Sequence, residues 1–199
     1  MSATESRSAP HELWITGDPA ADHLLSTNGN ALLVGMVLDQ QVPMEKAFAG
    51  PAVIAERMGG TFDVAAIAAL DVDDFVAICA AKPAVHRFPG SMGTRVHAVA
   101  RTLVERYDGD ATRLWSAAPD GAALKQAIAA LPGFGDQKAS IMTALLAKQW
   151  GVRPPGWQDA AGAYGNEGEH RSVADVVDAE SLLKVRAFKK QAKAAARNA

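Results

Sequence analysis

The chain has one cysteine, few aromatic residues and no long apolar run. Because Cys79 is the only cysteine among 199 residues, an intrachain disulfide, a thiolate zinc site and a cysteine-ligated iron–sulfur cluster are excluded. No apolar stretch approaches the roughly 20 residues that cross a bilayer, and the N-terminal residues lack the apolar segment of a signal peptide. We therefore expect a soluble cytoplasmic protein with no membrane partner.

The overall composition predicts an all-α protein. Apolar residues make up 49% of the chain and charged residues 21%, which supports a packed core and excludes wholesale disorder. Alanine, the best helix former, is abundant, whereas β-branched runs are scarce. Hydrophobic periodicity predicts roughly nine short helices. Residues 1–10 are predicted to be a disordered tail, and residues 11–199 a single domain.

Several helix boundaries follow from capping residues and helix breakers. The pair Asp18-Pro19 predicts an N-cap followed by proline at the first helical position. Residues 31–38 predict a buried helix, because they are apolar almost all round. Either Ser91 or Thr94 is predicted to cap a later long helix. Residues 151–171 are rich in glycine and proline, so we expect them to be irregular.

Charge is distributed unevenly along the chain. The formal net charge is −2, yet residues 184–199 carry six lysines and arginines and no acid. A basic helix over residues 179–197 could bind a phosphate backbone. The alternative is a solvated helix end whose cations complement the helix dipole.

The most informative motif lies within residues 121–150. Two predicted helices are joined there by Leu131-Pro132-Gly133-Phe134-Gly135. Gly133 and Gly135 allow a sharp turn and let another molecule approach the backbone closely. The helix that follows offers free N–H groups and the positive end of its dipole to a phosphate. An ordinary helical hairpin with a glycine turn is the alternative, although the flanking apolar residues make the pattern more specific.

This segment resembles the helix-hairpin-helix motif of the base-excision DNA glycosylases, the HhH-GPD superfamily. The segment from Val37 to Pro43, which contains Gln40-Gln41, is similar to the start of the family's domain, where the alkylation-repair branch commonly shows a Gln-Gln pair. The resemblance covers residues 30–160. It implies an all-α glycosylase fold in which two helical subdomains flank a cleft.

The function implied by this resemblance is removal of a damaged or modified base from double-stranded DNA, by a monomer. The Gln-Gln pair favours alkylated purines. The alternative is a catalytically inactive protein that keeps the glycosylase fold and binds DNA or a lesion.

The resemblance implies a catalytic aspartate beyond the second helix of the hairpin. Asp159 is the candidate, because it is the only carboxylate between Asp136 and Glu167. A carboxylate stabilises the positive charge that builds on the sugar as the N-glycosidic bond breaks, and it can activate a water. Glu167 and Glu169 are reserve candidates, and a role of Asp159 as the N-cap of a short helix is the alternative.

Bifunctional members of the family carry a Schiff-base lysine two residues after the second glycine of the hairpin. That position is Gln137 here, and Lys138 lies about 100° further around the helix. The resemblance therefore implies a monofunctional enzyme that leaves the strand uncut, with Lys138 contacting phosphate. The residues expected to bind DNA at the hairpin are Gly133, Phe134, Gly135, Gln137 and Lys138.

Other residues are expected to handle the flipped base. Gln41 aligns with the residue that some members insert into the minor groove, and Gln40 is the second choice. A helix-terminal amide bonded to backbone is the alternative. Trp157 and Tyr164 are expected to stack on the base, with ordinary packing as the alternative.

No cofactor and no transition metal are predicted. The five histidines show no close metal-ligand spacing. The hairpin carbonyls of the family can hold a monovalent cation, which makes Leu131 to Phe134 a candidate position for such an ion.

Overall fold

The structure is a computed structural model that describes residues 12–198, and the side chains of residues 12–196. Within that range the protein is all-helical, without a β-strand, as predicted. No helix there is both long and apolar enough to cross a membrane. The predicted tail, residues 1–10, lies outside the described residues.

The helices follow one another along the whole described chain. They are α1 (Pro19–Thr27), α2 (Gly29–Leu38), α3 (Met44–Arg57), α4 (Val64–Ala69), α5 (Val72–Ala80), α6 (Pro89–Tyr107), α7 (Ala111–Ser116), α8 (Gly121–Ala129), α9 (Asp136–Gln149), α10 (Trp157–Ala161) and α11 (Ala179–Asn198), with 3₁₀ helices η1 (Gly162–Gly165) and η2 (Val173–Asp175). Helices α8 and α9 form the predicted helical pair, and α11 is the predicted basic helix.

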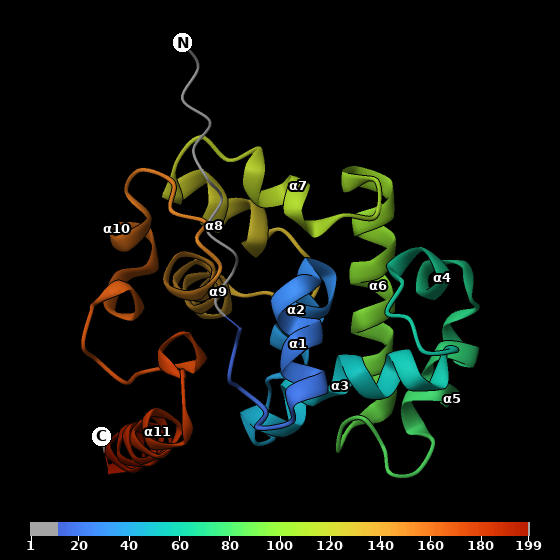
Figure 1. The fold of residues 1–199 in the computed structure, drawn as a ribbon, viewed down its shortest axis with the longest axis horizontal. Coiled ribbons are helices and arrows are strands. Elements are labelled where there is room, and N and C mark those ends of the chain that lie inside the picture. Colours follow the sequence, from blue (N-terminus) through green and yellow to red (C-terminus); the bar gives the residue numbers. More distant parts are fainter. Residues whose placement is uncertain (1–11, 199) are drawn as a thin grey trace.

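Helix α2 lies at the centre of the fold (Figure 1). Its residues from Ala31 to Leu38 are all buried, as their apolar run predicts. Helix α3 packs closely against it: a Cβ added at Gly35 would lie 2.6 Å from a ring carbon of Phe48, and one at Gly50 would lie 2.4 Å from Leu38. The two glycines therefore permit close packing that fixes the C-terminal end of α2 and the loop after it.

Aspartate side chains begin many of the helices. The carboxylates that accept N–H groups in the first turn of the following helix belong to Asp18, Asp63, Asp71, Asp110 and Asp120. Helix α6 differs, because it begins at Pro89 with no side-chain cap. The predicted cap at Ser91 or Thr94 is therefore wrong, since proline at the first position already sets the helical φ there.

The helices pack in groups on either side of α2. Helices α4 and α5 pack on α6, whereas α8 and α10 pack with α9, on the opposite side of α2 in Figure 1. The prediction that residues 151–171 are irregular is wrong in part, because they contain α10 and η1. A Cβ at Gly121 would lie 2.4 Å from the Trp157 Cα, so α10 is held directly against the start of α8.

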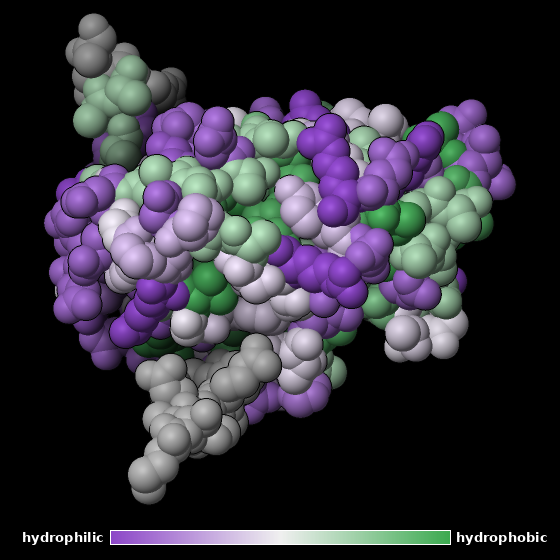
Figure 2. All heavy atoms as spheres, turned by 90° about the horizontal axis from the view of Figure 1, so that it is seen from above, coloured by the Kyte–Doolittle hydropathy of each residue, from purple (hydrophilic) through white to green (hydrophobic). Residues whose placement is uncertain are grey.

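The surface is mainly polar on the face shown in Figure 2, where hydrophobic residues appear as separate patches. The large hydrophobic side chains that are exposed come from different parts of the chain: Phe88, Val104, Val177 and Leu183. Scattered apolar side chains of this kind are normal on a protein surface.

Candidate functional site

A cavity of about 780 Å³ lies where the end of α2 and the loop after it face the turn between α8 and α9. The seven residues expected to contact DNA all line it: Gln40, Gln41, Gly133, Phe134, Gly135, Gln137 and Lys138. Two segments far apart in the sequence therefore meet at one cavity. Its volume lies within the range of ligand-binding sites in proteins.

Three charged residues that the sequence did not single out also line this cavity. They are Asp39, Arg95 and Lys189. The Asp39 side chain is only 14% exposed, and its Oδ2 lies 3.7 Å from the Lys189 Nζ. The one sequence signal that could have pointed to Asp39 is its position directly before the glutamine pair. Nothing local predicted that Arg95 on α6 and Lys189 on α11 would join it.

Helix α11 forms one wall of this region. Besides the contact between Lys189 and Asp39, Arg186 forms an ion pair with Glu45 at the start of α3. A second cavity of about 400 Å³ lies beside these residues and shares Val42 and Lys189 with the first. The basic helix is therefore docked, along part of its length, against residues 39–43, the glutamine loop that follows α2.

The two glutamines of the loop have different roles. The Gln40 Oε1 accepts a hydrogen bond of 2.6 Å from Arg95, which holds this amide inside the structure. Gln41 is exposed and has a φ of 57°, in the left-handed region that side chains rarely adopt. The loop thus presents Gln41 outward and uses Gln40 as an anchor, the arrangement expected if Gln41 is the inserting residue.

His86 supports the same loop through a hydrogen bond to the Gln40 carbonyl. Its Nδ1 accepts the Phe88 N–H at 3.0 Å, so Nε2 carries the hydrogen and donates to the Gln40 carbonyl at 2.9 Å. Burial is the main cause that lowers the pKa of His86. The imidazole therefore acts as a neutral support for the loop.

The two hairpin glycines are also different from each other. Gly133 has a φ of +79° and an ideal Cβ 3.4 Å from Arg95, so the turn itself favours glycine there. Gly135 has a φ of −105°, which any residue adopts, and no atom lies within 4 Å of an ideal Cβ. The fold does not require glycine at position 135, and its bare backbone faces open space at the start of α9.

The hairpin carbonyls are partly used within the turn. The Leu131 carbonyl accepts the Phe134 N–H at 3.2 Å. The candidate position of a monovalent cation at Leu131 to Phe134 stays a prediction. Within residues 12–198, no cluster of three or more histidine, cysteine, aspartate or glutamate side chains could hold a metal ion.

The step of one residue from Gln137 was expected to turn the Lys138 side chain away, but this side chain lines the cavity. Both Gln137 and Lys138 line the cavity, because it extends around the first turn of α9. The Lys138 Nζ donates a 2.7 Å hydrogen bond to the Val37 carbonyl. Desolvation by burial, the main cause, lowers its pKa to about 8, although the nearby Asp39 carboxylate opposes this shift.

The remaining predicted site residues lie elsewhere. Asp159 is exposed and lines a separate pocket of about 430 Å³ with Lys125 and Asp136. Trp157 packs against the start of α8. Tyr164 is closer to the main cavity, because its hydroxyl accepts a 2.8 Å hydrogen bond from Gln137. The structure thus links Tyr164 to Gln137, one of the residues expected to bind DNA, whereas Asp159 and Trp157 do not line the main cavity.

The reserve carboxylates lie near Tyr164, in the loop after η1. Glu169 forms an ion pair with Arg171 and accepts a 3.1 Å hydrogen bond from Asn166. The hydrogen bond from Arg171 is the main cause that lowers the pKa of Glu169. Glu167 is exposed. Neither side chain lines the main cavity.

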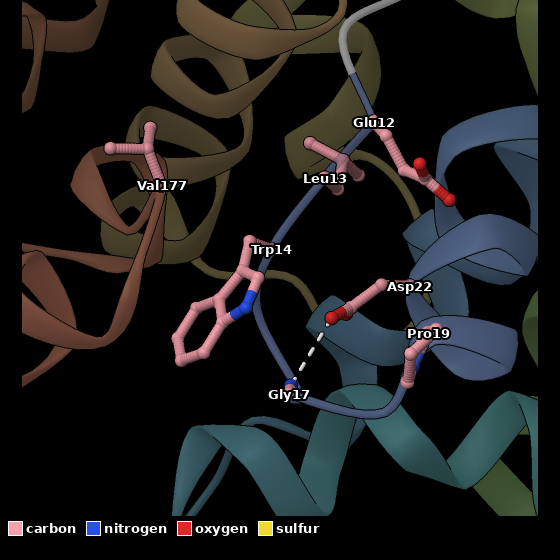
Figure 3. Close-up of a pocket in the computed structure, with 7 residues that line it drawn as sticks. All are labelled: Glu12, Leu13, Trp14, Gly17, Pro19, Asp22 and Val177. Carbon is pink, nitrogen blue, oxygen red and sulfur yellow. Dashed lines mark hydrogen bonds between the residues drawn. The ribbon is translucent and has the colours of Figure 1, made fainter.

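Another cavity, of about 360 Å³, lies beside the segment before α1 (Figure 3). Its buried carboxylate, Asp22, accepts hydrogen bonds from the backbone N–H groups of Ile15, Thr16 and Gly17 and from the Thr16 hydroxyl. These donors satisfy both carboxylate oxygens. Asp22 therefore fixes the path of the chain before α1.

The main cavity combines a glycine-rich backbone turn, an outward amide, three cations and one carboxylate among the described residues that line it. Bare backbone N–H groups and cations suit a phosphate, and the carboxylate suits a developing positive charge. Comparison of the chain with models of known protein families, with curated proteins and with solved structures finds no match.

Proposed function

We propose that the protein is a DNA glycosylase that acts as a monomer and removes a damaged or modified base from double-stranded DNA. The observation that carries this proposal is the meeting of all seven expected DNA-contacting residues at one cavity. In this proposal the fold is that of a helix-hairpin-helix glycosylase, and the helices on either side of α2 are its two subdomains.

DNA binding would rest mainly on backbone contacts. The open backbone at Gly135 offers N–H groups at the N-terminus of α9, where the helix dipole favours a phosphate. Arg95, Lys138 and Lys189 give the cavity an excess of positive charge over Asp39. Gln41, which is exposed and has a left-handed backbone conformation, fills the gap that a flipped base leaves in the duplex.

Base removal breaks the bond between C1′ and the base nitrogen, and the electron pair leaves with the base. Water then adds to C1′ and loses a proton. Asp39 is the carboxylate within the cavity that can stabilise the cationic sugar and accept this proton. Asp159, the candidate from the sequence, can take this part only if DNA binding brings the sugar to its own pocket.

A lesion panel tests the proposal directly. The full chain is incubated with duplexes that each carry one modified base, alkylated purines included, and alkali then reveals abasic sites as strand breaks. Asp39→Asn and Asp159→Asn form a matched pair. We expect Asp39→Asn to slow base removal by about 10²-fold or more and Asp159→Asn to leave it unchanged. The opposite result would move the chemistry to the pocket of Asp159.

A lesion-binding protein without catalysis is the second candidate. The observation that favours it is the position of Asp159, exposed and outside the main cavity. In that case the panel gives no abasic sites with any duplex, while one lesion duplex binds more tightly than unmodified DNA. Base removal from any duplex eliminates this candidate.

A further inference from the structure

Arg95, in the second turn of α6, contacts both of the segments that are expected to meet DNA. Its Nη1 donates a 2.6 Å hydrogen bond to the Gln40 Oε1 in the glutamine loop. Its aliphatic stem lies against the hairpin turn, where an ideal Cβ at Gly133 would be 3.4 Å from the Arg95 Cδ and 3.8 Å from its Cβ and Cγ. One half-buried side chain therefore touches two segments that are far apart in the sequence.

The place of Arg95 in the fold makes these contacts a bridge between groups of helices. Helix α6 packs with α4, α5 and α2, whereas the hairpin turn joins α8 to α9 on the opposite side of α2 (Figure 1). Met92, one turn earlier on α6, is buried, and its Sδ lies 3.9 Å from the same Nη1 of Arg95. The guanidinium is thus held between α6 and the glutamine loop, while the stem packs on the hairpin.

The glutamine loop is held at Gln40 by a second contact from the same part of the chain. His86, shortly before α6, donates a 2.9 Å hydrogen bond to the Gln40 carbonyl. Gln40 is therefore fixed through both its backbone and its side-chain amide. Gln41 follows directly and is exposed, so the direction in which it points depends on how Gln40 is held.

We propose that Arg95 is a positioning residue that fixes the distance between Gln41 and the hairpin backbone, so that one duplex can meet both at once. This inference rests on the proposed function, because it takes DNA as the ligand. Two contacts reinforce each other fully only when their spacing is set before binding, since ordering them on the DNA would otherwise cost conformational entropy. Arg95 supplies this order in the free protein.

The first measurement needs no DNA. Nitroxide labels are attached at Gln41→Cys and Gly135→Cys in the full chain, and Cys79 stays unlabelled because it is buried. We expect the dipolar coupling between the labels to report a narrow range of distances, and a broader range once Arg95→Met is added. Arg101→Met is the matched control and should leave the range narrow, because Arg101 lies on the same helix and pairs with the exposed Glu105.

The second measurement is the affinity for a duplex that contains an abasic site, followed by fluorescence anisotropy in a double-mutant cycle of Arg95→Met and Gln41→Ala. We expect Arg95→Met to weaken binding by about tenfold or more. Gln41→Ala should then cost much less affinity in the Arg95→Met protein than in the unaltered protein. An arginine that acts only as a phosphate contact would instead give additive losses.

Gln40→Ala keeps the test decisive if Arg95→Met folds poorly. It removes the hydrogen-bond acceptor of Arg95 and no charge, so it should broaden the label distances and weaken binding in the same way. Label distances that neither variant broadens overturn the proposal, and so do additive losses in the cycle. Failure of the unaltered protein to bind any duplex is a different result. It refutes the proposed function, whereas the label distances still decide whether Arg95 fixes the two segments.

Discussion

The Lys138 side chain donates a hydrogen bond to the Val37 carbonyl, which joins the first turn of α9 to the last turn of α2. A cation is favourable at the C-terminal end of a helix, where carbonyl groups lack partners. Burial opposes this benefit, because it lowers the pKa of Lys138 from 10.5 to about 8. The contact therefore holds the Lys138 amine at the end of α2, at the cost of making its charged form less stable.

This cost predicts a pH dependence of stability. Between about pH 8 and 10.5 the unfolded chain binds more protons than the folded chain at this residue, so its contribution to the free energy of unfolding rises with pH. The stability of the unaltered protein relative to Lys138→Gln should increase across that range in urea unfolding. Other titrating groups are present in both proteins and cancel. A difference that is constant with pH would contradict the burial of the amine.

The glutamine pair should respond asymmetrically to substitution. Gln40→Ala leaves the partly buried Arg95 without its 2.6 Å acceptor, which should lower the free energy of unfolding by about 1.5 kcal/mol. Gln41→Ala should change it by less than about 0.5 kcal/mol, because the side chain is exposed. It should nevertheless weaken binding to an abasic duplex by about tenfold. Chemical denaturation and fluorescence anisotropy distinguish the two effects, and equal behaviour of the two variants would refute the assignment.

The hairpin glycines offer a second matched pair. Gly133→Ala places a side chain at a φ of +79° against Arg95, so it should destabilise the fold by about 1 to 2 kcal/mol. Gly135→Ala fits its φ and meets no neighbouring atom, so stability should be retained. If this backbone binds phosphate, Gly135→Ala should weaken binding equally for duplexes of different sequence. Unchanged affinity would mean that the start of α9 does not touch DNA.

The exposed lysines beyond the docked part of α11 test whether this helix meets the DNA backbone. Lys190→Gln combined with Lys193→Gln should reduce the slope of log affinity against log salt by up to about 1.8, if each lysine neutralises one phosphate. Lys184→Gln is the control, because Lys184 pairs with Glu180 on the same helix at 2.7 Å. A slope that the double variant does not alter would show that these cations are only solvated.

Local signals explain which parts of the fold were predictable. Leu131-Pro132-Gly133 separate the two helices of the hairpin, and an uninterrupted apolar run marks α2. Both elements could therefore be predicted from short stretches of sequence. The start of α6 was mispredicted because proline replaces the usual capping side chain. Helix α10 was missed because it is short and depends on packing against Gly121, a contact that no local pattern reveals.

The candidate site likewise contains residues that the sequence predicts and residues that it does not. The glutamine pair and the hairpin could be recognised from the sequence, since each is a continuous motif. The meeting of Asp39, Arg95 and Lys189 could not, because their distance in the chain says nothing about their distance in space. The position of Asp159 depends on how α10 packs beside α8, and it too required the structure.

The wall formed by α11 has a consequence for how the site comes into being during synthesis. Because domains are made from the N-terminus onward, α2, the glutamine loop and the hairpin are complete before Arg186 and Lys189 exist. Until then Asp39 and Glu45 lack the cationic partners that α11 supplies. A growing chain can therefore assemble its central helices first and acquire the finished cavity only when α11 docks.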